Sequence, residues 1–462
     1  MFHENNQQLS PAGIEKKAPA YRPYTLHNFR QIPQIKNNFS EEELFDMEVV
    51  GTVLPFRANN YVVDELIDWS NPKDDPIFRL TFPQKEMLLH QHYEEMSEVM
   101  KSGADKKTIN ETALKIRNDL NPHPAGQADY NVPVHCGEKL GGVQHKYNET
   151  VLFFPRQGQT CHAYCTFCFR WPQFVSTEQE KFAAKEAGQL IDYIRDHKEI
   201  TDLLITGGDP MVMKGKVFAN YIDTIIDAGL DHLQTIRIGT KSLAYWPYKF
   251  TSDKDADLVI GAFEKIVKSG KHLSIMAHFN HYKELQTREV RKAVKRIIST
   301  GAQIRTQSPI FAYINDSADV WAKMWRMQVK MKMVPYYMFM ARDTGAQHYF
   351  KVTAERAWKI FREAYQRVSG LARTVRGPVM SCAPGKVQFL GVSKVAGEKV
   401  FTLRFIQGRN PDWVHRPFFA KFDKEAIWID DLIPAFGEEN FFFEDELEQI
   451  YHEKKSLIDE VM

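Results

Sequence analysis

The sequence predicts an α/β protein built around a parallel (β/α) sheet that curls into a partial or full barrel, with a helical N-terminal extension and a small α+β C-terminal appendage. Two observations carry this prediction. Six short apolar runs alternate with amphipathic segments between residues 151 and 370, and several of those segments end at a glycine, as helices often do. Repeated strand and helix units favour parallel strands joined by right-handed crossovers. The candidate strands cover residues 151–155, 203–208, 235–240, 273–279, 303–310 and 334–340.

The N-terminal part divides into an irregular arm, residues 1–40, and a helical cap region, residues 41–133. The arm is polar and contains four prolines, so we expect it to pack loosely. Ser40 is followed by three acids, the pattern of a capped helix start. Two further helices are predicted within residues 82–103 and 106–120, followed by a turn-rich link over residues 121–133.

The barrel is expected to span residues 134–390, with helices in segments such as 178–197, 255–270, 287–301 and 354–370. In such a fold the loops after the strand C-termini build the active site. Residues 391–462 form the appendage. Short strands are predicted at or near 387–392, 399–406 and 425–432, then an acidic helix at 443–455, with aromatic residues in its core or at a subunit interface.

Composition excludes several classes of protein. Lys plus Arg number 60 against 59 for Asp plus Glu, which leaves no long-range field to attract nucleic acid. No run of eighteen apolar residues is present, so no membrane span is expected. The odd cysteine count of 5 and the lack of a secretory signal favour a reducing compartment, and we expect a cytoplasmic protein.

Three of the five cysteines lie in residues 160–171, TCHAYCTFCFRW, as a C-x3-C-x2-C array of Cys161, Cys165 and Cys168. Three thiolates on one loop can bind three irons of a [4Fe-4S] cube and leave the fourth iron open to a small molecule. Zinc is the alternative, but it takes four ligands, and only Cys136 and Cys382 remain as distant cysteine candidates. We therefore expect an iron–sulfur cluster.

The second candidate strand ends in TGGDP, residues 206–210. Consecutive glycines let backbone groups approach a ligand closely, and Asp209 can accept a hydrogen bond from an ammonium group. After C-x3-C-x2-C, this segment resembles the motif that binds the amino group of S-adenosylmethionine (SAM) in radical SAM enzymes. The chain resembles the lysine 2,3-aminomutase family, radical SAM aminomutases that also use pyridoxal phosphate (PLP). The resemblance covers roughly residues 60 to 390 and is carried by DDPIFRLTFP, NPHPAGQ, HKYNETVLF, CHAYCTFCFR, LLITGGDP, TIRIGT, HFNH, TQS, VPYYMF and APGK.

The resemblance implies a barrel of the radical SAM type, a [4Fe-4S] cluster on Cys161, Cys165 and Cys168, and a SAM site formed by Thr206, Gly207, Gly208 and Asp209. It also implies that Lys386, in APGK, forms an aldimine with PLP. The sequence departs from the family pattern in two places. A single Gly385 replaces a longer glycine run, and Thr150 stands where an arginine is expected, although Lys146 keeps a cation nearby for the phosphate. The zinc-binding cysteines of some family members are missing, so no zinc is predicted.

For the substrate, the resemblance implies that Arg170 meets the α-carboxylate and that Gln307 lies close by. His278 and Asn280 fall at a strand end facing the same mouth, and a structural role for them is as plausible as contact. Family members that act on lysine use two aspartates for the distal ammonium. Arg342 and Cys382 occupy the matching positions here, so lysine is disfavoured, and Arg342 favours glutamate or another acidic or neutral amino acid.

The predicted function is therefore a radical SAM amino-acid 2,3-aminomutase, in which a 5′-deoxyadenosyl radical drives a PLP-assisted 1,2-amino migration. Two alternatives stay open: a radical SAM enzyme of this family without PLP, and a degenerate iron–sulfur interaction or scaffold protein. The expected partners are a small amino-acid substrate, a reductant such as flavodoxin or ferredoxin, and further copies of the chain in a homo-oligomer.

Overall fold

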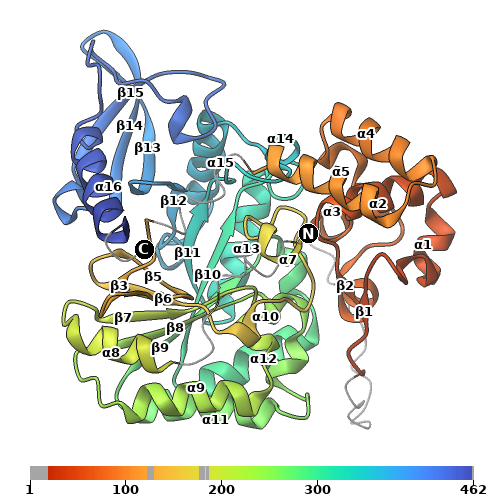
Figure 1. The fold of residues 1–462 in the computed structure, drawn as a ribbon, viewed down its shortest axis with the longest axis horizontal. Helices are drawn as coiled ribbons and strands as arrows, with labels where there is room; N and C mark the ends of the chain where they lie inside the picture. The colour runs from red at the N-terminus through yellow and green to blue at the C-terminus, as the bar shows by residue number, and fades with distance from the viewer. Residues whose placement is uncertain (1–18, 122–129, 176–182, 184–186, 460–462) are drawn as a thin grey trace, which may run out of the picture.

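The computed structural model describes residues 19–121, 130–175, 183 and 187–459, and it is dominated by one sheet of eleven strands (Figure 1). The strand order is β15-β14-β13-β12-β11-β10-β9-β8-β7-β6-β5. Each neighbouring pair from β6 to β12 is parallel. These seven strands are β6 (Thr150–Phe153), β7 (Asp202–Ile205), β8 (Thr235–Thr240), β9 (His272–His278), β10 (Gln303–Pro309), β11 (Val334–Phe339) and β12 (Arg376–Ser381).

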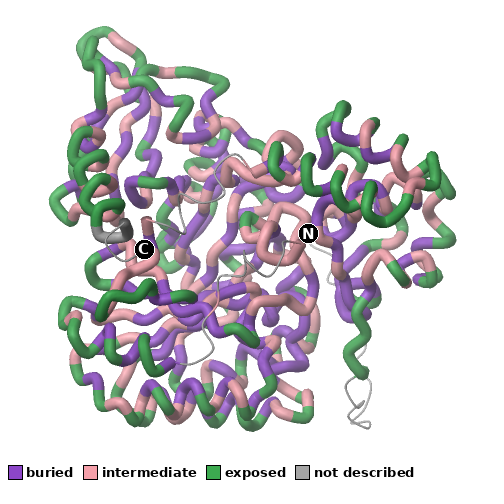
Figure 2. The backbone as a smooth tube through the Cα atoms, in the orientation of Figure 1, coloured by how far each residue is buried: buried purple, intermediate pink, exposed green. Residues whose placement is uncertain are grey.

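A helix follows each of the first six parallel strands, which confirms the predicted alternation. Several helices begin at a residue whose side chain caps the helix, as Thr287, Ser317 and Thr353 do. Their inner faces are buried against the sheet, and their outer faces are exposed (Figure 2). The helices are α8 (Gly188–Asp196), α9 (Gly215–Asp227), α11 (Ala256–Lys268), α12 (Arg288–Ser299), α13 (Ala318–Lys330) and α15 (Ala354–Gln366).

The sheet is an open one within the described residues, because β5 and β15 lie at its two ends and do not pair with each other. Antiparallel strands extend it on both sides: β5 (Val143–Tyr147) beside β6, and β13 (Gly385–Val395), β14 (Glu398–Gly408) and β15 (Pro417–Lys421) beyond β12. The C-terminal segment is therefore hydrogen-bonded to the parallel sheet through β13. It ends in α16 (Glu444–Asp459), at the predicted acidic segment.

One predicted C-terminal strand is wrong. Residues 425–432 contain a short 3₁₀ turn (Ile429–Asp431), and the third strand of the appendage is instead β15. Alternate residues of β15 are buried, and its first residue is Pro417, which a strand start tolerates. Phe418 packs with Phe405, Phe441 and Phe443, so these aromatic residues form the core of the appendage.

Helices also fill the predicted cap region (Figure 1). Ser40 and Glu43 form the capping box of α2 (Glu41–Val53). The other cap helices are α3 (Pro76–Thr81), α4 (His90–Lys101) and α5 (Lys106–Asp119). The expected loose arm is wrong over residues 23–38, which form β1 (Pro23–Tyr24) and α1 (Pro33–Asn38) and bury Phe29 and Ile35 completely. β1 pairs with β2 (Ala58–Asn59).

Some predictions concern residues outside the described ranges. These are the first half of the arm, most of the turn-rich link and the start of the segment 178–197. After the link, β3 (Val134–His135) and β4 (Glu138–Lys139) form a small hairpin. No helix in the described part of the chain is long and apolar enough to cross a membrane.

Candidate active site

The three cysteines lie on the loop that follows β6, the first parallel strand, where they were predicted. All three are free and partly exposed. Burial raises the pKa of each thiol, and the neighbouring cysteines raise the pKa of Cys161 and Cys168 further; for Cys168 the pKa is about 12. Thiols in such surroundings become thiolates when a metal ion supplies positive charge. The donor set therefore fits a metal cluster.

No group of three or more His, Cys, Asp or Glu side chains in the described ranges is arranged to hold one metal ion. A [4Fe-4S] cube places each thiolate on a different iron, so its three cysteines do not converge on a single point. A structural zinc ion gathers four ligands around one centre.

The N-terminal part of the chain holds the cysteine loop from outside. Arg57 donates to Thr160 Oγ1 at 2.8 Å and to the Cys161 carbonyl at 3.3 Å. Tyr21 Oη donates to the carbonyl of His162 at 2.7 Å. Neither Arg57 nor Tyr21 belongs to a motif, and each contact joins residues more than one hundred positions apart, so no local pattern in the sequence marks them.

The glycine motif packs directly on the cysteine loop. The Asp209 amide donates to the carbonyls of Gly158 at 3.0 Å and Thr160 at 2.8 Å. A Cβ on Gly208 would lie 2.5 Å from the Thr160 carbonyl oxygen. Gly207 has φ +152°, and a Cβ there would lie 2.4 Å from Gln159 Nε2. Only glycine allows this approach, so the two motifs meet at one site.

The Asp209 carboxylate is surrounded by protein donors. It accepts hydrogen bonds from the backbone of Met211 and Lys241 and from the hydroxyls of Thr240 and Ser242, all within 2.8–2.9 Å. Burial raises its pKa, and these hydrogen bonds oppose the rise. A carboxylate has about four acceptor sites, so protein donors fill it. The side chain ties the loop after β7 to the loop after β8, and a contact of Asp209 with a ligand ammonium stays a prediction.

Lys386 is the second residue of β13 and has the surroundings of a reactive amine. Its Nζ donates to Gln407 Oε1 at 2.5 Å and lies 5.1 Å and 5.2 Å from the ring centres of Tyr147 and Tyr337. Burial, followed by the charge of Arg237, lowers its pKa to about 7. An amine that is largely neutral near pH 7 can attack an aldehyde.

Lys146 lies beside the turn that precedes Lys386. Its Nζ donates to the Cys382 carbonyl at 2.5 Å, and burial together with the charge of Arg409 holds its pKa well below the ordinary value. Thr150 is buried and hydrogen-bonds Asp202 at 3.2 Å. A basic side chain is therefore present near Lys386 despite the missing arginine.

Arg170 and Arg342 approach the same aromatic ring. The Cζ atom of each lies 5.2 Å from the ring centre of Phe169, and Arg170 also lies 4.5 Å from that of Phe154. Burial lowers the pKa of both, to about 10 for Arg170. Neither guanidinium forms an ion pair with a carboxylate of the described residues, and the buried Nε of Arg342 has no hydrogen-bond partner there.

The predicted residues of β9 and β10 separate into two groups. Gln307 pairs with His278 in the sheet, and His278 Nε2 is buried with no hydrogen-bond partner in the described part. Asn280 is fully buried, accepts from Lys241 Nζ at 2.8 Å and donates to Ser308 Oγ at 2.9 Å. Asn280 therefore has a structural role, whereas His278 has an unused polar atom.

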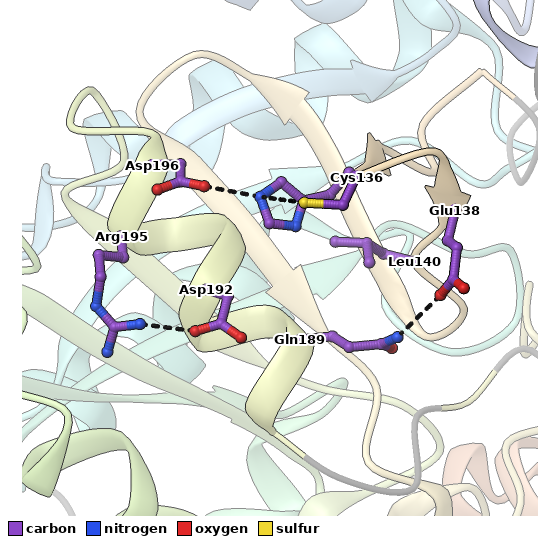
Figure 3. A pocket seen from close by; sticks show the side chains of 8 residues that line it. Cys136, Glu138, Leu140, Gln189, Asp192, Arg195 and Asp196 are labelled. Atoms are coloured by element: carbon purple, nitrogen blue, oxygen red, sulfur yellow. Dashed lines mark hydrogen bonds and ion pairs between the residues drawn. The ribbon is translucent and has the colours of Figure 1, made fainter.

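A separate pocket of about 390 Å³ lies between the β3–β4 hairpin and α8 (Figure 3). His135 contacts Asp196 at 2.9 Å and Cys136 Sγ at 3.8 Å there. The pocket contains none of the predicted site residues.

A parallel sheet with a three-cysteine loop after its first strand and a glycine pair after its second defines an iron–sulfur enzyme of the radical SAM class. Comparison with known proteins shows to which family of this class the chain belongs. "Putative L-lysine 2,3-aminomutase" of Aquifex aeolicus is 30% identical over 86% of this chain and 93% of its own length. The chain belongs to the lysine 2,3-aminomutase family, whose members are radical SAM isomerases that use SAM and an iron–sulfur cluster.

Other relatives differ in the substrate that their names give. L-lysine 2,3-aminomutase of Methanococcus maripaludis is 23% identical over 75% of this chain and 68% of its own. Glutamate 2,3-aminomutase of Clostridioides difficile is 26% identical over 54% of each chain. Among solved structures, Streptococcus suis SuiB aligns over 62% of this chain and 61% of its own, with TM-score 0.36 and 14% identity. No protein-family model matches the chain.

Proposed function

We propose that this radical SAM aminomutase is PLP-dependent, with Lys386 as the lysine that binds the cofactor covalently, and that its substrate is an amino acid other than lysine. The observation that carries the proposal is a set of basic side chains that lack carboxylate partners, two of which bind the turn before Lys386. In the described residues Lys146, Arg170, Arg342 and Arg409 form no ion pair. Lys241 and Lys249, in contrast, are paired with Glu284 at 2.7 Å and with Asp255 at 2.9 Å. Arg57 and Arg117 also lack a carboxylate partner, but they lie outside this group and bind backbone carbonyls or a hydroxyl.

Enclosed cations without carboxylates are costly unless an anion binds them. PLP carries a phosphate and an amino acid carries at least one carboxylate, so together they supply the missing charge. The neutral amine of Lys386 and the two tyrosine rings beside it suit an aromatic aldehyde. The residues of this chain therefore fit the cofactor.

The proposed roles of the other motifs follow from their positions. Cys161, Cys165 and Cys168 hold the cluster, and the backbone of Thr206, Gly207 and Gly208, packed on the same loop, contributes to the SAM site. When bound, the cluster and SAM supply the radical that removes hydrogen from C3 of the substrate, and PLP disperses unpaired spin during the amino migration. Asp209 and Arg57 position these loops through their hydrogen bonds.

Arg342 is the residue that argues against lysine as the substrate. A substrate ammonium about 4 Å from its guanidinium is disfavoured by about 4 kcal/mol at an effective dielectric of 20. Cys382, on the other side, is a buried thiol that donates to the Gly385 carbonyl and provides no negative charge, because burial raises its pKa to about 11. With Arg170 on the α-carboxylate, Arg342 suits a second carboxylate, so glutamate or a related acidic or neutral amino acid is favoured.

A radical SAM reaction without PLP is the second candidate, favoured by Thr150 in place of an arginine. Borohydride reduction followed by peptide mapping separates the two. The proposal expects a phosphopyridoxyl group on Lys386 of the PLP-treated enzyme, and none in the Lys386→Met variant. Label on another lysine, or on none, would contradict it. We further propose flavodoxin or ferredoxin as the reductant, which reconstitution with each protein would test.

A further inference from the structure

The C-terminal appendage reaches the candidate PLP site through the end of β14. Gln407 accepts the hydrogen bond from Lys386 Nζ, and its own amide donates to Glu149 Oε1 at 2.9 Å. Arg409, two residues further on, directly follows β14. The appendage is thus hydrogen-bonded to the reactive lysine, a contact that no sequence motif indicates.

Arg409 and Lys146 hold the turn before Lys386 from two directions. The turn, residues 382–385, is closed by a hydrogen bond of 2.9 Å from the Cys382 amide to the Gly385 carbonyl. Arg409 Nε donates to the Ala383 carbonyl at 2.9 Å, next to the Cys382 carbonyl that accepts from Lys146. Two basic side chains, Lys146 and Arg409, therefore bind adjacent carbonyls of the turn that precedes Lys386.

The charge of Arg409 is not neutralised by these contacts. Its other acceptors include Asn131 Oδ1 at 2.7 Å and the Tyr130 carbonyl at 3.5 Å, and its Cζ atom lies 5.2 Å from the ring centre of Tyr451; none of these groups is a carboxylate. The charge of Arg409 disfavours the protonated form of Lys146 at this turn, because two cations repel each other. An anion that bridges both cations would remove this repulsion, and a phosphate dianion has the required charge and acceptors.

We propose that Arg409, together with Lys146, binds the phosphate of PLP, so that the C-terminal appendage completes the cofactor site. This inference rests on the proposed function. It also explains how the site functions with Thr150, which is committed to Asp202 and offers no cation.

The test compares two ligands that differ only in the phosphate. The full-length protein is titrated with PLP and with pyridoxal, and the dissociation constants are measured for wild type, Arg409→Met and Arg409→Lys. Arg404→Met is the matched control, because Arg404 lies on the same strand and hydrogen-bonds Gln388 at 3.0 Å and 3.1 Å, away from Lys386. Circular dichroism melting confirms that each variant is folded.

Loss of a charge-assisted hydrogen bond predicts that Arg409→Met weakens PLP binding by about tenfold to a hundredfold. Pyridoxal binding should change by less than about twofold, since it has no phosphate. Arg409→Lys should recover part of the loss, and Arg404→Met should match wild type.

Two results would overturn the inference: equal weakening of PLP and pyridoxal by Arg409→Met, which marks a purely structural contact, or no change for PLP. Failure of the wild-type protein to bind PLP at all would instead refute the proposed function on which the inference depends. The two failures are thus distinguishable.

Discussion

Replacing Lys386 by methionine should change how the stability of the protein depends on pH. Burial lowers the pKa of this amine to about 7, whereas in the unfolded chain it returns to about 10.4. Between these two values the unfolded chain binds a proton that the folded protein does not bind. Unfolding then takes up a proton, so the stability of the wild-type protein rises with pH relative to a variant that lacks the amine.

The two pKa values give the size of the effect. From pH 7 to pH 9, the free energy of unfolding of wild type should rise by about 2 kcal/mol relative to Lys386→Met. Denaturant unfolding of both PLP-free proteins at pH 7, 8 and 9 measures this difference, and groups common to both cancel. Lys394→Met is the control, because Lys394 is exposed on the same strand and its amine is in water in both states.

A difference between wild type and Lys386→Met that stays constant from pH 7 to pH 9 would refute the reasoning. It would mean that the amine is not desolvated by the tyrosine rings and the appendage. Lys386 would then lack the neutral amine that the proposed function requires of it.

Three further predictions concern the cluster, the substrate and the contact between the two motifs. Replacing Cys161, Cys165 and Cys168 together by alanine should abolish the binding of about four irons per chain after anaerobic reconstitution. The control Cys136→Ala should leave the iron content unchanged. Iron and sulfide analysis measures both, and full iron content in the triple variant would contradict the assignment. Arg342→Asp should raise kcat/KM for lysine relative to glutamate by about a hundredfold or more. The control Arg356→Asp, at an exposed site, should leave this ratio unchanged. An unchanged ratio in Arg342→Asp would show that Arg342 does not contact the distal group of the substrate. Gly208→Ala should lower the free energy of unfolding by about 1–3 kcal/mol, because the added Cβ would lie 2.5 Å from a backbone oxygen. Gly261→Ala is the control: it lies in the interior of α11 with no atom within 4 Å of the added Cβ, and it should raise the free energy of unfolding by up to about 1 kcal/mol. Similar melting temperatures for the two variants would argue against the close contact of the loops.

The parallel sheet could be predicted from the sequence because its strands are short apolar runs separated by amphipathic helices. All six candidate strands fall within two or three residues of β6 to β11. The cysteine loop was correctly placed after the first strand, since strand order fixes where that loop emerges. The strand β15 was missed because its first residue is a proline, Pro417. Residues 425–432 contain several apolar residues and therefore resemble a strand more closely.

Contacts between distant parts of the chain could not be predicted in this way. The hydrogen bond from Arg57 to the cysteine loop joins residues more than one hundred positions apart, and no local pattern marks it. The turn before Lys386 was recognised, but Arg409 was not, because its position depends on how the appendage pairs with β13. The four protein donors around the Asp209 carboxylate could not be predicted either, because three of them lie at or directly after the end of β8, about thirty residues further along the chain.

Turnover under anaerobic conditions tests the central claim most directly. The reconstituted enzyme is incubated with SAM, a reductant and a panel of amino acids, and mass spectrometry follows 5′-deoxyadenosine and isomerised amino acid. We expect both products, with glutamate or a related acidic or neutral amino acid converted faster than lysine, and neither product from the variant with alanine at Cys161, Cys165 and Cys168. Lysine converted faster than every other amino acid would contradict the proposed role of Arg342, and SAM cleavage without an isomerised amino acid from any member of the panel would contradict the aminomutase function.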